Sequence, residues 1–168
     1  MNRLITLIMA LLILITFVGC NSLQSKTDNN VTFYYRNVDI KHGAADGVIG
    51  SETRHAGEYR NDFEHLITIY LKGPRENDHT SPFPAGIYLK QFTLGSDRAY
   101  ITLSSHMSLL SGLDLVIACA CLTNTVLELT GVSSIEITAE DGTLDGNPYL
   151  IFNSKDFSYL DTYADTLN

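Results

Sequence analysis

Ser104, Ser105 and His106 come closest to a catalytic group, because a serine nucleophile beside a histidine base is the chemistry of many hydrolases. The nucleophile and its base must meet through space within hydrogen-bond reach, and residues adjacent in sequence seldom do so. The segment has no Gly-x-Ser-x-Gly turn and no third partner at a characteristic spacing. We therefore expect these residues to end a strand and begin a loop, and we expect no catalytic site.

Metal-binding residue types are present without the spacing of a metal site. The five histidines include no pair at the helical i, i+4 spacing of zinc enzymes: His42, His55, His65, His79 and His106. The pairs Asp141-Gly142 and Asp145-Gly146 lack the spacing and the closing glutamate of an EF-hand. The glycines between residues 43 and 50 precede no Lys-Ser or Lys-Thr of a phosphate loop. We expect solvated or loop histidines, tight turns, no metal and no cofactor.

Cys20 carries the clearest chemistry, which is lipid attachment. An apolar run from Leu4 to Val18 follows Arg3, and it is shorter than the roughly 20 residues that cross a bilayer, as is typical of a signal peptide. The residues Phe17-Val18-Gly19-Cys20 resemble a bacterial lipobox, although Phe17 stands where leucine is usual. The resemblance implies cleavage after Gly19 and acylation of Cys20. The alternative is an uncleaved anchor, and either reading places the domain outside the cytoplasmic membrane.

Three regions are expected along the chain. Residues 1–19 form a signal peptide, residues 20–30 a lipidated cysteine with a flexible tether, and residues 31–168 a single domain. The chain has 19 acidic and 11 basic residues, with a net charge of −8. Such a charge argues against nucleic acid as a partner and against electrostatic adhesion to anionic lipid. We therefore expect lipid, rather than charge, to hold the protein at the membrane.

The residue patterns predict an α+β domain with the order β-β-α-β-β-α-β. Strands are expected over 31–36, 48–54, 87–94, 98–103 and 132–139, with a further edge strand over 149–152, and amphipathic helices over 58–72 and 113–129. Gly73, which precedes Pro74, and Gly131 should end the helices. Each helix must bury its apolar stripe, so we expect a two-layer sandwich with both helices on one face of a small mixed sheet. Cys119 and Cys121 are expected to be buried in the second helix without a disulfide.

Several segments share their order and spacing with a known domain family. Residues 66–74 are similar to a helix that ends in Gly-Pro, and Pro84-Ala85-Gly86-Ile87 to the entry into a hairpin. Residues 98–104 are similar to the next strand, with Thr102 where aspartate is usual, and residues 122–135 to an Asn-Thr-Leu helix followed by a Gly-Val strand. Together they resemble the GerMN domain of sporulation and spore-germination lipoproteins. The resemblance implies a non-catalytic module on the outer face of a bacterial membrane, akin to ring-building domains of secretion systems.

One face of the predicted sheet has nothing in the chain to cover it. Strand alternation turns Ile87, Leu89, Ile101 and Leu103 toward the helices, and it turns away four other residues: Tyr88, Lys90, Tyr100 and Thr102. Tyr34 is a further candidate for this face, whereas Tyr35 and Tyr70 are expected in the core. Because tyrosine is favoured in interfaces, we expect these residues to bind an envelope protein or further copies of the chain. The alternative is an extracytoplasmic small-ligand-binding protein or a hydrolase, which needs a deep pocket with convergent polar groups.

Overall fold

The strands of the domain form two sheets. The structure, a computed structural model, describes residues 29–38, 47–157 and 160, so the expected signal peptide, Cys20 and most of the tether lie outside the described residues. A three-stranded antiparallel sheet has the order β2-β1-β3, with β1 at Asn30–Asn37, β2 at Ile49–His55 and β3 at His79–Thr80. A four-stranded sheet has the order β4-β5-β6-β7. Its strands are β4 (Leu89–Leu94), β5 (Arg98–Leu103), β6 (Ser134–Ala139) and β7 (Leu150–Asn153), and only β5 and β6 run parallel.

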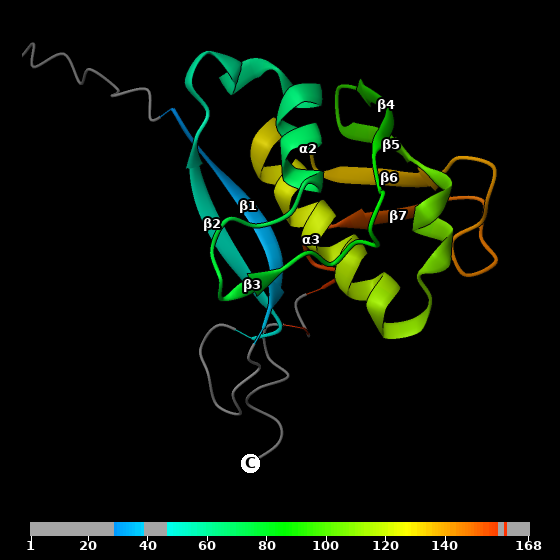
Figure 1. The fold of residues 1–168 in the computed structure, drawn as a ribbon. Coiled ribbons are helices and arrows are strands. Elements are labelled where there is room, and N and C mark those ends of the chain that lie inside the picture. Colours follow the sequence, from blue (N-terminus) through cyan, green and yellow to red (C-terminus); the bar gives the residue numbers. More distant parts are fainter. Residues whose placement is uncertain (1–28, 39–46, 158–159, 161–168) are drawn as a thin grey trace, which may run out of the picture.

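Two α-helices lie between the sheets (Figure 1). They are α2 at Phe63–Leu71 and α3 at Gly112–Thr130, each preceded by a short 3₁₀ helix, η1 at Gly57–Asn61 and η2 at Ser105–Leu109. The buried residues of α3 lie on most sides of the helix, because it packs on β1 and on β6. Among the described residues, α3 alone is long and apolar enough to cross a membrane, but most of that stretch is buried in the domain as a core helix.

The α+β class is confirmed, but the strands do not share the single sheet that we expected. The reason lies at the edge of β1, where the backbone N–H of Tyr34 donates to Oγ1 of Thr125 on α3 at 2.9 Å. The helix thus takes the position that a further strand would need in order to pair with β1. Both sheets then pack on the helices from different sides, with the core between them (Figure 1).

Several element boundaries differ from the prediction, and one strand is additional. The first helix begins at Phe63 rather than at residue 58, because Oδ1 of Asp62 accepts the N–H of His65 at 3.0 Å and caps the helix there. Strand β4 begins at Leu89, and its pairing with β5 shifts between Leu89 and Gln91. Strand β3 was not predicted, since two polar residues are too few to show an alternation.

Two tyrosines and two cysteines occupy the core, as predicted. Tyr35 and Tyr70 are fully buried, with their ring centroids 5.1 Å apart. The hydroxyl of Tyr35 donates to the carbonyl of Tyr70 at 3.0 Å, and burial raises the pKa of both phenols. Cys119 and Cys121 are fully buried free thiols, and burial raises the pKa of Cys119 to about 12. All four side chains therefore serve packing.

Replacing Gly73 with valine is expected to lower the free energy of unfolding by about 1–3 kcal/mol. Gly73 follows the end of α2 with φ of +99°, a conformation that a β-branched residue rarely adopts, and its carbonyl accepts a hydrogen bond from Nη2 of Arg54 at 2.9 Å. Urea unfolding of the purified chain measures the loss. Gly73→Asn is the matched variant, because asparagine tolerates positive φ better and should lose less. Equal stability of the valine variant and the wild type would contradict the prediction.

Candidate functional site

The face of the four-stranded sheet that points away from the helices is the candidate site. No described element covers it, and it presents the exposed side chains of Tyr88, Tyr100, Tyr149 and Ile151, which are 50%, 44%, 50% and 41% exposed. We call these four residues, with Lys90, Thr102, Glu136, Thr138 and Glu140, the open face. Three tyrosines and an isoleucine on one uncovered surface are a composition typical of protein-binding patches.

Alternation along β5 and β6 builds the open face. On β5, Ala99, Ile101 and Leu103 are buried under the helices while Tyr100 points outward. The parallel register of β5 and β6 places Tyr100 opposite Glu136, and β7 places Ile151 on the other side of Glu136. Tyr100, Glu136 and Ile151 therefore form one row across the sheet.

Glu140 connects two of the predicted residues at one end of the open face. Its Oε1 pairs with Nζ of Lys90 at 2.6 Å, and its Oε2 accepts the hydroxyl of Tyr88 at 3.1 Å. The hydrogen bonds from Lys90 and Tyr88 hold the pKa of Glu140 below its usual value, and Glu140 in turn raises the pKa of Lys90. Sequence reasoning missed Glu140, although it lies two residues beyond Thr138 in the outward phase of β6.

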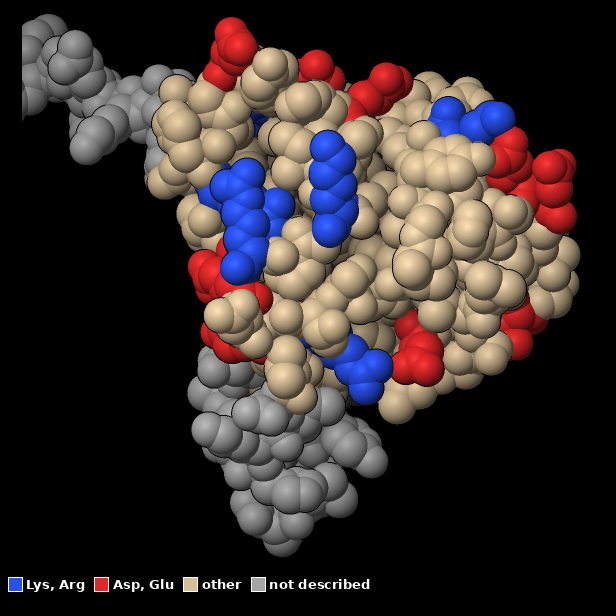
Figure 2. Space-filling model, viewed as in Figure 1, with Lys and Arg blue, Asp and Glu red and all other residues tan. Residues whose placement is uncertain are grey.

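The other polar groups of the open face are also paired with one another. Oγ1 of Thr138 donates to Oγ1 of Thr102 at 2.9 Å, and Nη1 of Arg98 lies 3.5 Å from Oε2 of Glu136. The carboxylates of Glu136 and Glu140 therefore each have a basic side chain beside them, Arg98 and Lys90. The open face combines aromatic area with little local excess of charge, although the whole chain is acidic. On the side of the molecule drawn in Figure 2, acidic side chains lie mostly near the border, whereas several basic side chains lie nearer the middle.

The structure does not bring Tyr34 to the open face. Tyr34 lies on β1, in the other sheet, and its hydroxyl donates to Oε2 of Glu128 on α3 at 2.6 Å. Tyr34 was expected on the open face because all strands were assumed to share one sheet, and that assumption was wrong. Tyr34 packs between β1 and α3 instead.

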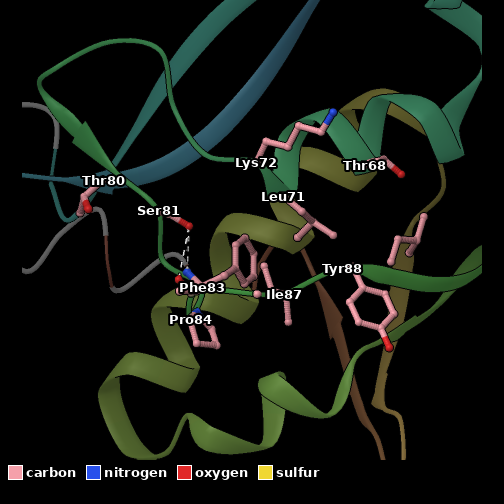
Figure 3. A pocket seen from close by; sticks show the side chains of 12 residues that line it. Thr68, Leu71, Lys72, Thr80, Ser81, Phe83, Pro84, Ile87 and Tyr88 are labelled. Carbon is pink, nitrogen blue, oxygen red and sulfur yellow. Dashed lines mark hydrogen bonds between the residues drawn. The ribbon is translucent and has the colours of Figure 1, made fainter.

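An open groove of about 610 Å³ adjoins the open face at Tyr88. Figure 3 shows Thr68, Leu71 and Lys72 of the α2 end on one side, and Phe83, Pro84 and Ile87 of the following segment on the other. None of the residues that line it is acidic, and Lys72 is the one basic residue among them. This open groove mixes apolar side chains with polar ones such as Thr80 and Ser81, and its lining includes no carboxylate, histidine or cysteine.

The serine and histidine that suggested a hydrolase lie close together in the structure. Oγ of Ser104 is 3.4 Å from Nδ1 of His106, but Ser104 is 1% exposed and its Oγ already accepts the N–H of Tyr88 at 3.3 Å. Ser105 and His106 begin η2, directly after β5. Among the described residues, no carboxylate forms an ion pair or hydrogen bond with His106. The arrangement is that of a strand end, in which the hydroxyl that lies beside His106 is buried.

Comparison with known proteins gives one family and a shared fold. A family model described as Germane, sporulation and spore germination, matches residues 32–145. The first GerMN domain of the sporulation protein GerM from Bacillus subtilis is similar in structure, with a TM-score of 0.51, 10% identity, and coverage of 70% of this chain and 91% of that chain. A protein from Clostridium perfringens described as a candidate lipoprotein has a TM-score of 0.50, 16% identity, and coverage of 76% and 88%. No curated protein matches the chain.

Proposed function

Because the chain belongs to the Germane family of sporulation and spore germination, we propose that it is a lipid-anchored module that assembles with protein partners in the cell envelope. The family supports a role at the envelope in sporulation or germination. The partner in this proposal is an envelope protein or a further copy of the chain. Cys20 supplies the membrane attachment and the open face supplies the contact.

The open face is the observation that carries this proposal. A four-stranded sheet packed on helices by one side only leaves its other side to solvent or to a partner. Here that side carries exposed tyrosines on β5 and beside β4 and β7, whereas its charged groups satisfy one another. A partner that covers it buries aromatic area without leaving a charge unpaired, which is the favourable case for association.

The competing proposal, an extracytoplasmic hydrolase or small-ligand-binding protein, has less support. The described groove is open, and its lining includes no carboxylate, histidine or cysteine that could act as an acid, base or nucleophile. The nearest serine and histidine are arranged around a buried hydroxyl. We therefore propose that the module works by binding and carries out no reaction.

Replacing Tyr88 and Tyr100 together with serine is expected to reduce partner binding by about tenfold or more, because exposed tyrosines at an interface centre carry much of its affinity. The measurement is photo-crosslinking in the native envelope, with a crosslinking amino acid placed at Ile151, in the same row of the open face as Tyr100. The wild type should give a defined product and the double variant little of it. Both tyrosines are about half exposed, so the melting temperature should change little.

A matched control uses the same crosslinking amino acid at Tyr59, which is 41% exposed and lies on η1, outside the open face. That position should give no comparable product. Equal crosslinking from Tyr59, or an undiminished product in the folded double variant, would place the contact elsewhere on the domain and contradict the proposal.

A further inference from the structure

His79 is held beside two carboxylates at the end of the connection from α2 to β3. Its side chain is only 7% exposed, so the expectation of a solvated histidine is wrong for this residue. The carboxylates belong to Glu76 and Asp78, which lie at the surface with side-chain exposures of 53% and 73%. One ligand atom from each of the three residues lies within 4.8 Å of the other two.

The neighbours of His79 fix the orientation of its ring. Strand pairing sets His79 opposite Asn37, and the ring stacks on Tyr35 with centroids 6.5 Å apart. A Cβ atom at Gly50 would overlap Oδ1 of Asn37 and come within 2.5 Å of Cε1 of His79, so this close packing needs glycine at position 50. The ring is therefore built into the three-stranded sheet.

Asn37 also decides which ring nitrogen carries the proton. Its Nδ2 donates to the carbonyl of Gly47 at 3.2 Å, so its Oδ1 is the atom that faces Nδ1 of His79 at 3.1 Å. An amide oxygen only accepts, so Nδ1 must donate. In the neutral ring, Nε2 then has a bare lone pair. This is the arrangement that orients a metal-binding histidine through its other nitrogen.

Three oxygen atoms lie near Nε2 of His79. The carbonyl oxygen of Ser51 is 3.4 Å away, and Oε2 of Glu76 and Oδ1 of Asp78 are each 3.9 Å away. The lone pair of Nε2 is repelled by the electron-rich oxygen atoms around it. A cation bound between them would replace this repulsion with attraction. Glu76 is positioned as well, because its backbone N–H donates to Oε2 of the buried Glu52 at 3.3 Å.

We propose that Nε2 of His79 and the carboxylates of Glu76 and Asp78 bind a divalent transition cation of the zinc type. Zinc takes imidazole nitrogen and carboxylate oxygen at about 2.0–2.2 Å, which sets two tetrahedral ligands about 3.4 Å apart. Small rotations of the exposed Glu76 and Asp78 side chains reach that spacing from 3.9 Å. Three protein ligands leave a position open to water or to a donor group of a partner. The bound ion ties the α2–β3 connection to the three-stranded sheet.

The test is zinc binding by the full-length chain, purified without a histidine tag. Calorimetry with ZnCl₂ should give one ion per chain with micromolar affinity, and zinc should raise the melting temperature. Glu76→Gln combined with Asp78→Asn changes only surface side chains, and we expect it to weaken binding at least about tenfold. His79→Asn should do the same. His55→Asn, at an exposed histidine of β2, is the control and should bind as the wild type does.

Three outcomes would overturn the proposal. One is no saturable binding of zinc by the folded wild type. Another is binding that the Glu76 and Asp78 double variant leaves unchanged, which would place the ion elsewhere. The third is an NMR spectrum of His79 that shows protons on both ring nitrogens in the presence of saturating zinc, because Nε2 would then hold a proton in place of the ion.

Discussion

Replacing Glu52 with glutamine is expected to lower the free energy of unfolding by about 3–5 kcal/mol, because it leaves the guanidinium of Arg54 buried without its counter-charge. Glu52 is 2% exposed and Arg54 is 7% exposed, and Nε of Arg54 lies 2.5 Å from Oε1 of Glu52. Oε2 of Glu52 accepts the backbone N–H of Arg75 at 2.8 Å, so the loop after α2 also loses an anchor. Urea unfolding of the wild type and variant measures the difference.

The same pair makes stability depend on pH. Burial by itself would raise the pKa of Glu52, but hydrogen bonds from Arg54 and from the backbone N–H of Arg75 and Glu76 outweigh it and hold the pKa below its usual value. A carboxyl with a lowered pKa in the folded state stabilises the protein above its unfolded pKa of about 4.3, and that contribution is lost as pH falls through the folded value. The free energy of unfolding should therefore decline below about pH 4.3, and less steeply in Glu52→Gln.

Two further variants distinguish the loss of the buried ion pair from a nonspecific loss of stability. Glu58→Gln changes an exposed carboxyl on η1 and should keep both the wild-type stability and its pH profile. Glu52→Gln combined with Arg54→Met removes both charges and should recover part of the loss, since a buried apolar side chain needs no counter-charge. Wild-type stability of Glu52→Gln at neutral pH would contradict the role assigned to the pair.

Replacing Cys20 with alanine is expected to abolish stable membrane attachment. A mature lipoprotein is held by its acyl chains, each buried methylene adding about 0.8 kcal/mol, and this acidic chain has no basic surplus with which to hold an anionic membrane. The variant should appear in the soluble fraction or as an uncleaved precursor. Cys119→Ala removes a buried thiol of α3 and should leave the protein in the membrane fraction. An unmodified Cys20 in a mature, membrane-bound chain, seen by mass spectrometry, would contradict the lipid anchor.

The sequence predicts the elements of this fold better than their pairing. Alternation along β1 and β5 shows which residues turn inward, but it does not show which strands share hydrogen bonds, and so one sheet was expected in place of two. Strand β2 gave a weak signal because its inward positions at 52 and 54 are charged residues. Only the tertiary structure shows that Glu52 and Arg54 pair with each other and that the Arg54 guanidinium lies over the ring of Phe33.

The candidate site was only partly predictable, because the sequence shows which residues of a hairpin share a face but not which other strands pair with it. Tyr88, Lys90, Tyr100 and Thr102 come from one hairpin, whose geometry is local, and the structure keeps their side chains on the open face. Glu140 and Ile151 reach that face through pairing across β6 and β7, which no local pattern reveals. His79 meets Asn37 from 42 residues away, so its burial could not be read from the residues beside it.

The contact of β1 with α3 has a consequence for the order in which the domain can fold. The hydrogen bond from Tyr34 to Thr125 spans 91 residues, and β5 finds its parallel partner β6 only after α3. A topology with such distant contacts folds slowly, because a long loop must close before its contacts can compensate for the lost chain entropy. A nascent chain that has emerged only as far as the hairpin of β4 and β5 has α2 beside β1, through Tyr70, but still lacks the long contact of α3. The core therefore closes only once α3 and β6 have followed.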